Sequence, residues 1–374
     1  MHLIIDADPL VYSCGFSAET TAYHLVTENQ ETGDIEEAYF APYDGKTAGK
    51  RMQKYLQDNP QLEVVEKERR VIPDTEENAI AATRTKLFSI EKEIREHYGL
   101  VRFDSITTIL SGPGNFREAL ATRFPYKGNR DPSHKPYWYQ SIRNYITGSW
   151  GGIVVTGREA DDECSILARK DLAAGADYII ATIDKDLDQI PGKHFNYLKR
   201  VFYALSETES EQFFWEQCLS GDATDGIPGC FKMGGVRAKS VVQSICAGVC
   251  TSSAERSGTG EAFATGSAIL AERGLTEYRS NPSGTISPES SVRSDLQFRG
   301  YYGGADRSIA TWSAIIAAYE ASTTKAGCPY SRSDAEAAAI ETARLVYLQH
   351  YEGELWNPPP QPHGWLHGYG ESDE

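Results

Sequence analysis

Short apolar runs alternate with longer amphipathic stretches over the first half of the chain. Runs with the length of buried strands occur at residues 2–6, 105–110, 152–156 and 178–183. Stretches with helical periodicity occur between them, at residues 75–98, 135–147 and 159–174. Asp74 or Thr75 can cap the first of these helices. This alternation predicts an α/β fold with a mostly parallel sheet and helices on both faces.

The pattern changes after residue 208. Residues 209–245 have helical character with no obvious strand, and a glycine-rich run at 226–235 interrupts them. Residues 248–304 are rich in Ser, Thr and Gly, with only a marginal helix at 261–273, and helical periodicity returns at 308–322 and 333–351. We therefore predict an α/β domain at 1–208, a helical module at 209–246, an insertion or linker at 247–306, and C-terminal helices with a Pro/Gly-rich tail at 307–374.

The composition is that of an ordinary globular protein, with 40% hydrophobic residues and a net charge of −16 from 53 acidic and 37 basic side chains. No run approaches the roughly 20 apolar residues of a membrane span. Without a secretory signal pattern we expect a cytosolic, monomeric protein with reduced cysteines and no membrane partner. An acidic protein repels nucleic acid at long range, so any such binding needs local basic patches or bridging metal ions.

Acidic residues recur where predicted strands end or helices begin. The four groups are Asp6 and Asp8; Glu159, Asp161 and Asp162; Asp184 and Asp186; and Asp222 and Asp225. Ligand sets made only of oxygen suit hard cations such as Mg²⁺ or Mn²⁺. Two such ions about 4 Å apart could activate a water and stabilise the leaving oxygen of a phosphodiester.

Each acidic group also has a simpler interpretation. The acids from Glu159 to Glu163 could be first-turn residues of a helix, favoured by its dipole. Asp222 and Asp225 could be caps and turn formers beside Gly226, and Asp8 before Pro9 could be a turn residue. Crowded acids at a buried strand end, as at Asp184 and Asp186, seldom occur without a cation to offset their repulsion.

Basic and aromatic residues gather between positions 117 and 143, against the sign of the whole chain. The basic members are Arg117, Arg123, Lys127, Arg130, Lys135 and Arg143, and the aromatic members are Phe124, Tyr126, Tyr137, Trp138 and Tyr139. This combination favours a segment that binds single-stranded nucleic acid, although a solvated helix with core aromatics would look similar. The run GCFKMGGVRAK at 229–239 offers backbone amides and three basic side chains that could hold a phosphate backbone without reading bases.

Five blocks occur in a fixed order along residues 1–246. They are IIDAD (4–8), FPYKGNR (124–130), READD (158–162), TIDKD (182–186) and SGDATDGIPG (220–229). In type, order and approximate spacing they resemble the signature blocks of the flap endonuclease and 5′-3′ exonuclease family, particularly its bacteriophage exonuclease branch.

The resemblance implies a PIN-like α/β domain joined to a helix-three-turn-helix module that grips duplex DNA. It implies two Mg²⁺ or Mn²⁺ ions held by Asp6, Glu159, Asp161, Asp162, Asp184, Asp186, Asp222 and Asp225. It implies that Lys127 and Arg130, together with Asp161 and Asp184, carry catalysis on DNA 5′ ends and flaps. DNA-binding positions would be Arg117, Arg123, Tyr126, Lys127, Arg130, Gly229, Lys232, Gly234, Gly235, Arg237 and Lys239, with K⁺ at the glycine-rich turn.

One departure from the family pattern concerns its metal site. Family members carry a further aspartate on the strand before the basic segment, where residues 110–117 here read LSGPGNFR. The expected function is a metal-dependent 5′ nuclease acting on DNA, with RNA in hybrids as a further substrate. Two alternatives stay open: a haloacid-dehalogenase-like phosphatase, suggested by Asp6, Asp8, Asp222 and Asp225, and a catalytically weakened DNA-structure-binding protein, suggested by the absent aspartate.

Overall fold

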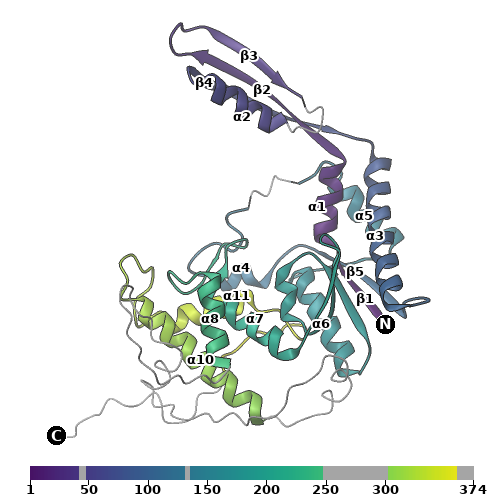
Figure 1. Ribbon diagram of the computed structural model, residues 1–374, viewed down its shortest axis with the longest axis vertical. Coiled ribbons are helices and arrows are strands. Elements are labelled where there is room, and N and C mark those ends of the chain that lie inside the picture. Colours follow the sequence, from purple (N-terminus) through teal and green to yellow (C-terminus); the bar gives the residue numbers. More distant parts are fainter. Residues whose placement is uncertain (42–47, 131–134, 247–301, 360–374) are drawn as a thin grey trace, which may run out of the picture. The chain divides into compact units, whose positions relative to one another are not determined.

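The computed structural model describes residues 1–41, 48–130, 135–246 and 302–359 (Figure 1). The predicted insertion at 247–301, with its marginal helix, and the tail from residue 360 lie outside the described residues. Within the described ranges, no helix combines the length and the apolarity that a membrane span requires.

The chain forms two compact units that interleave along the sequence. Unit 1 comprises Met1–Gly114, Asp131–Asp184 and Lys193–Ala204. Unit 2 comprises Asn115–Arg130, Lys185–Gly192 and Leu205–Glu374. These units group residues by spatial proximity, and the domain boundaries at 208, 246 and 306 stay a prediction.

Unit 1 is built on a six-stranded sheet in the order β6-β5-β1-β7-β8-β9. Its strands are β1 (His2–Asp6), β5 (Ser105–Ser111), β6 (Ile153–Val155), β7 (Tyr178–Thr182), β8 (Gly192–Asn196) and β9 (Val201–Leu205). The first five run parallel, and β1 lies between β5 and β7, with Ile5 opposite both Thr108 and Ala181. The predicted mixed α/β architecture with a mostly parallel sheet is therefore confirmed, and the carboxyl ends of β1, β5 and β7 share one edge.

Helices cover this sheet. They are α1 (Asp8–Ser17), α3 (Glu76–Tyr98), α5 (Tyr139–Ser149) and α6 (Ala160–Ala173). Leu3 and Ile5 of β1 pack with apolar residues of α1, α3 and α5, whereas α6 also packs on β1, β5 and β7. The Thr75 hydroxyl accepts a hydrogen bond from Asn78 N at 3.2 Å, as a helix N-cap should. The predicted helix at 135–147 begins later than expected, because residues 135 and 136 are irregular and residues 137 and 138 form a turn before α5.

A second, antiparallel sheet of unit 1 was missed by the sequence analysis. It orders β3 (Ile35–Phe40), β2 (Glu19–Asn29) and β4 (Leu62–Pro73), and α2 (Ala48–Asp58) packs on β2 and β3. Leu25, Phe40, Ala48 and Met52 form its separate small core. We call the described residues of 19–73 the hairpin module.

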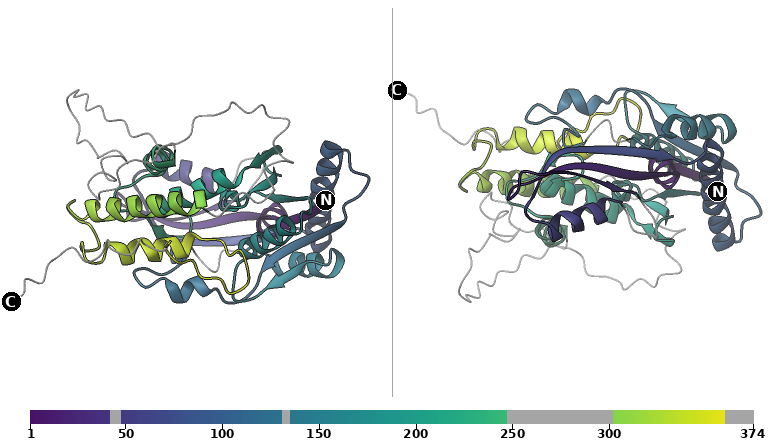
Figure 2. Two further views of the ribbon diagram at one scale, coloured as in Figure 1. Left: turned by 90° about the horizontal axis from the view of Figure 1, so that it is seen from below. Right: turned by 90° about the horizontal axis from the view of Figure 1, so that it is seen from above.

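Unit 2 is mainly helical. Its elements are α4 (Phe116–Leu120), η1 (Lys185–Gln189), α7 (Glu207–Ser220), β10 (Gly221–Asp222), β11 (Ile227–Pro228), α8 (Gly235–Cys246), α10 (Tyr302–Ser322) and α11 (Ala335–Val346). Figure 2 shows α10 and α11 side by side, and their core includes Trp312, Tyr319 and Ala339. The expectation of no strand near residues 209–245 is wrong, because β10 and β11 pair as a two-residue antiparallel ladder.

Arg117, one of the predicted DNA-binding residues, has a structural role in unit 2. Its side chain is 2% exposed, and Nε and Nη2 donate to the carbonyl oxygens of Leu345 and Tyr347 at 2.8 and 2.6 Å. Arg123 is committed similarly, because it pairs with Glu341 and donates to Ala338 O at 2.9 Å. Both guanidinium groups hold α11 and its C-terminal extension.

We expect Arg117→Ala to lower the free energy of unfolding by about 2–4 kcal/mol, because two buried carbonyls lose their donor. Urea denaturation would measure the change. The exposed Arg84 of α3 is the control, and Arg84→Ala should stay within about 0.5 kcal/mol of the wild type. Equal denaturation midpoints for the two variants would contradict this role of Arg117.

Candidate active site

The carboxyl ends of β1 and β7 bring two predicted site residues of unit 1 together through a shared hydroxyl. The Asp6 side chain is buried, and its Oδ2 accepts a hydrogen bond from Thr182 Oγ1 at 2.8 Å. Thr182 Oγ1 in turn accepts one from Asp184 N at 2.9 Å. The parallel pairing of β1 and β7 produces this arrangement, because it places the two strand ends at the same sheet edge.

Burial and like charge strongly perturb the Asp6 carboxyl group. Its pKa is raised to about 8 by burial first, and then by the negative charges of Asp8 and Asp184, while the Thr182 hydrogen bond acts in the opposite direction. At neutral pH the ion-free protein therefore holds Asp6 mainly protonated. A cation placed beside these carboxylates would favour the charged form.

Asp8 is the first residue of α1, and its side chain also binds the end of β5. Its carboxylate accepts a hydrogen bond from Ser111 N at 2.9 Å and pairs with Arg143 Nη1 at 3.3 Å. Arg143 Nη2 donates to Ser111 O at 2.7 Å. Burial raises the pKa of Asp8, and the Ser111 hydrogen bonds and Arg143 counter that effect. The sequence offered no signal that Arg143 would reach this strand end.

The strand end that lacks the family's aspartate has no room for one at Gly112. A Cβ atom at this position would lie 2.2 Å from the Val155 carbonyl oxygen of the neighbouring strand. At the preceding position, Ser111 Oγ accepts a hydrogen bond from Ala160 N at the start of α6, at 2.9 Å. The end of β5 thus supplies a hydroxyl and backbone groups instead of a carboxylate.

The acids at the start of α6 do serve as helix-capping groups. Glu159 is the N-cap, and Asp162 Oδ2 accepts a hydrogen bond from Glu159 N at 3.1 Å in a reciprocal capping box. Glu163 pairs with Arg158. The simpler first-turn interpretation is therefore correct for Asp162, and metal ligation by Glu159, Asp161 and Asp162 stays a prediction.

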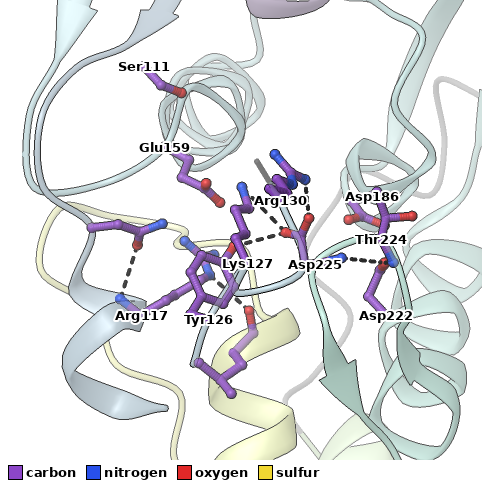
Figure 3. A network of polar contacts seen from close by, with 12 residues as sticks. Ser111, Arg117, Tyr126, Lys127, Arg130, Glu159, Asp186, Asp222, Thr224 and Asp225 are labelled. Carbon is purple, nitrogen blue, oxygen red and sulfur yellow. Dashed lines mark hydrogen bonds and ion pairs between the residues drawn. The ribbon is translucent and has the colours of Figure 1, made fainter. Parts of the chain in front are cut away.

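In unit 2, Asp225 is the meeting point of two sequence blocks far apart in the chain. Tyr126 Oη donates to its carboxylate at 2.9 Å, Lys127 Nζ lies 3.4 Å from it, and Arg130 forms an ion pair with it (Figure 3). Lys127 N also donates to Asp225 O at 2.9 Å. Lys127 has φ of +54°, a left-handed conformation that non-glycine residues rarely adopt. The structure therefore brings the predicted basic and acidic residues together on a tightly constrained turn.

Lys185 links Asp186 and Asp222, the other two predicted metal ligands of unit 2. The sequence analysis did not foresee this contact. Its ammonium group binds both Asp186 and Asp222, and Asp186 Oδ1 also accepts from Gln217 Nε2 at 2.7 Å. Burial alone would raise the pKa of Asp222, but Lys185 and backbone amides lower it overall. Asp222 Oδ1 accepts from Thr224 N at 2.7 Å, so Asp222 is also a turn former (Figure 3). The only sequence signal for Lys185 was its place between two acids.

The glycine-rich turn between α7 and α8 is shaped by close backbone contacts. A Cβ at Gly229 would lie 2.3 Å from Leu219 O, so the β10–β11 ladder itself requires this glycine. Lys232 has φ of +59°. The turn borders a hollow of about 450 Å³, lined by Ser220, Pro228, Gly229, Cys230, Phe231, Lys232, Met233, Gly234 and Pro329. DNA binding by Lys232, Gly234, Gly235, Arg237 and Lys239 stays a prediction.

The carboxylates fit a hard divalent cation by chemistry rather than by preformed geometry. Among the described residues, no three His, Cys, Asp or Glu side chains converge as a metal site. However, the candidate donors are all oxygens, and Asp6 is held in a buried position against two like charges. Such a donor set suits Mg²⁺ or Mn²⁺, which accept carboxylates and retain waters.

We expect the ion-free protein to lose stability as pH rises from about 4 to about 8. The pKa of Asp6 is about 8 in the folded protein, compared with an ordinary value of 3.8. The contribution of Asp6 to the free energy of unfolding is therefore complete below pH 3.8 and is lost as the pH rises through about 8. Thermal unfolding in EDTA across this range would measure the loss. Asp6→Asn should flatten the pH profile, and Mg²⁺ should restore the stability of the wild type most at pH 8. Identical profiles for the two proteins would contradict the assignment.

No protein-family model matches the chain. Among solved structures, the bacteriophage T5 D15 protein co-crystallised with metal ions is 11% identical, with 92% of this chain and 99% of that chain covered at a TM-score of 0.40. The bacteriophage T5 flap endonuclease in a pseudo-enzyme–product complex with DNA and metal ions is 14% identical, with 69% of this chain and 90% of that chain covered at a TM-score of 0.37. The T5 5′-exonuclease with bound zinc is 14% identical, with 71% of this chain and 91% of that chain covered at a TM-score of 0.35. At TM-scores this low, these likenesses carry no argument about the fold or activity of this chain.

Proposed function

We propose that this protein is a metal-dependent 5′ nuclease that hydrolyses phosphodiester bonds of DNA. The observation that carries the proposal is the buried Asp6 carboxyl group at a sheet edge, joined through Thr182 to Asp184 and destabilised as an anion by its neighbours. A protein rarely buries an acid against like charges unless another charge offsets them. The five sequence blocks of the 5′ nuclease family include both of these residues.

The residues that would hold divalent ions fall into two groups. Asp6, Glu159, Asp161, Asp162 and Asp184 belong to unit 1, and Asp186, Asp222 and Asp225 belong to unit 2. When bound, Mg²⁺ or Mn²⁺ would supply an activated water and charge neutralisation at the phosphate. In the ion-free protein, Thr182 orients Asp6, and Lys185 neutralises Asp222.

Lys127 and Arg130 would hold the phosphate that is cleaved. Both are now balanced by Asp225, which also accepts the Tyr126 hydroxyl. An incoming phosphate would compete with Asp225 for these cations, and until then the Asp225 carboxylate, 3.4 Å from Lys127 Nζ, keeps the ammonium group in place. Preorganised cations of this kind stabilise the charge that develops at phosphorus.

The α7–turn–α8 segment would grip duplex DNA away from the cut, in the manner of a helix-three-turn-helix module attached to a PIN-like domain. This DNA-binding proposal is supported by the β10–β11 ladder that requires Gly229, by the left-handed conformation of Lys232 and by the hollow beside them. Backbone amides and the Lys232, Arg237 and Lys239 side chains would bind phosphates without reading bases. A K⁺ ion at the turn is part of the same proposal.

The two alternatives are less well supported. A phosphatase with Asp6 as nucleophile would need an accessible carboxylate, but Asp6 is 1% exposed and Asp8 is committed to Ser111 and Arg143. A binding protein without activity is suggested only by the exclusion of a carboxylate at Gly112.

Incubation of 5′-labelled flap and recessed-end duplexes with the protein separates these functions. With Mg²⁺ we expect short labelled products, and with EDTA intact substrate that is still bound. Binding without cleavage in Mg²⁺ would favour the DNA-structure binder. A phosphoaspartate trapped at Asp6 from a small phosphomonoester would favour the phosphatase.

A further inference from the structure

The hairpin module carries four exposed cations on one side. The pairing of β2 with β4 places Arg69 opposite Tyr23 and Lys67 opposite Leu25. Tyr23 and Leu25 belong to the core under α2, so Lys67 and Arg69 are on the α2 side of the sheet. Lys67 Nζ lies 5.2 Å from the Tyr23 ring centre, which agrees with this placement.

Helix α2 adds two further cations to that side. Ala48 and Met52 face the sheet, so residues two positions away, Lys50 and Lys54, point away from it on the outer surface of the helix. Both side chains are exposed, as are Lys67 and Arg69. Helix α2 packs chiefly on β2 and β3, which leaves the cations of β4 beside it uncovered.

The opposite face of the same sheet is acidic. The register places Glu28, Glu37, Glu63, Glu66 and Glu68 there. Its basic residues already have partners, because Arg70 pairs with Glu68 and His24 with Glu37. On the α2 side the acids among the described residues are Glu36, Asp58 and Glu19, and Glu19 accepts a hydrogen bond from Tyr137 N at 2.7 Å. Within those residues, none of the four exposed cations takes part in an ion pair.

We infer that the α2 side of the hairpin module binds the phosphate backbone of duplex DNA, an inference that rests on the proposed function. In a chain with net charge −16, four exposed cations segregated onto one face form a local site for a polyanion. Lys50 and Lys54 are spaced by about 6 Å along the helix. Lys67 and Arg69 are spaced by about 7 Å along the strand, so each pair can contact one backbone.

The chemistry of this side favours duplex DNA over single strands. Single-strand binding uses exposed aromatic rings as stacking platforms. The aromatic residues of the α2 side among those described, Tyr23, Phe40 and Tyr55, are buried or partly buried in the module's core. The exposed Tyr39 is on the acidic face, opposite His24. Binding should therefore be electrostatic and independent of base sequence, and the acidic face should fix the side on which DNA lies.

The test uses the 374-residue chain with Lys50, Lys54, Lys67 and Arg69 all replaced by Gln. The control replaces Arg84, Lys92, Lys170 and Lys199 by Gln, which removes the same charges from exposed positions of unit 1 outside the module. Fluorescence anisotropy with a labelled 30-base-pair duplex in EDTA measures binding from 50 to 200 mM NaCl, and circular dichroism checks the folding of all three proteins.

We expect the module variant to bind duplex DNA at least about tenfold more weakly than the wild type at 50 mM NaCl. The slope of log K against log salt concentration should become shallower by about 0.9 for each lost phosphate contact. The control variant should bind like the wild type. Equal weakening in both variants, or wild-type binding by the module variant, would overturn the inference.

Cleavage by the wild-type protein in Mg²⁺ is measured separately. DNA binding that depends on the module, without any cleavage, would reject the nuclease proposal and retain the DNA-binding face. A wild-type protein that binds no duplex would overturn both.

Discussion

Replacing Asp184 with alanine is expected to reduce DNA cleavage by about 10³-fold or more while leaving DNA binding intact or stronger. Asp184 lies two residues beyond the end of β7, raises the pKa of Asp6 by its charge and donates its backbone N–H to the Thr182 hydroxyl that binds Asp6. Its loss removes a candidate metal ligand but also removes repulsion of the phosphate backbone. Single-turnover cleavage in Mg²⁺ and anisotropy in EDTA measure the two effects separately. Asp161→Ala should behave in the same way.

The matched control for Asp184 lies at the other end of the same strand. Asp177 precedes β7, its side chain is 54% exposed, and it pairs with Lys193. Asp177→Ala should therefore cleave at nearly the wild-type rate. Full turnover by both Asp184→Ala and Asp161→Ala would remove the basis for the metal-dependent mechanism.

The second large effect is expected for Lys127→Ala, which should lower kcat by about 10²–10³-fold at unchanged fold. Lys127 contacts Asp225 through both its ammonium group and its backbone N–H. Alanine keeps the backbone hydrogen bond but removes the cation that would neutralise the phosphate. Steady-state kinetics on a labelled flap would separate kcat from KM.

Lys92 of α3 provides the comparison for Lys127. Its side chain is 66% exposed, and its ion pair within the described part of the chain is the helical one with Glu96 at 3.8 Å, a contact worth little to stability. Lys92→Ala should leave kcat and KM unchanged. A similar loss of activity in both lysine variants would argue for a general charge effect rather than a specific phosphate contact.

The sequence predicted the parts of the fold that have strong local signals. The strands β1, β5, β6 and β7 are short apolar runs paired in a parallel sheet, in which β1 and β7 are the most buried, and α3 has a clear cap at Thr75. It could not predict the hairpin module, because β4 is exposed along most of its length and carries charges on both faces. Without one buried face, a strand loses the alternation of polar and apolar residues that identifies it.

For the candidate site, sequence reasoning found acids at strand ends but not their partners. Arg143 and Ser111 meet Asp8 across more than a hundred residues, and Lys185 reaches Asp222 from a separate segment. Such pairings depend on topology rather than on local spacing. The structural role of Arg117 was missed for the same reason, because its acceptors lie at the end of α11.

The central claim is that the acidic residues hold divalent metal ions, and Mn²⁺ binding followed by electron paramagnetic resonance tests it most directly. At pH 8 the wild-type protein should bind Mn²⁺ and should release it on addition of excess Mg²⁺. The double variant Asp6→Asn with Asp184→Asn, which removes charge but little volume, should lose at least one bound ion per molecule. Equal Mn²⁺ binding by the folded double variant and the wild type, or no Mn²⁺ binding by either, would contradict the account.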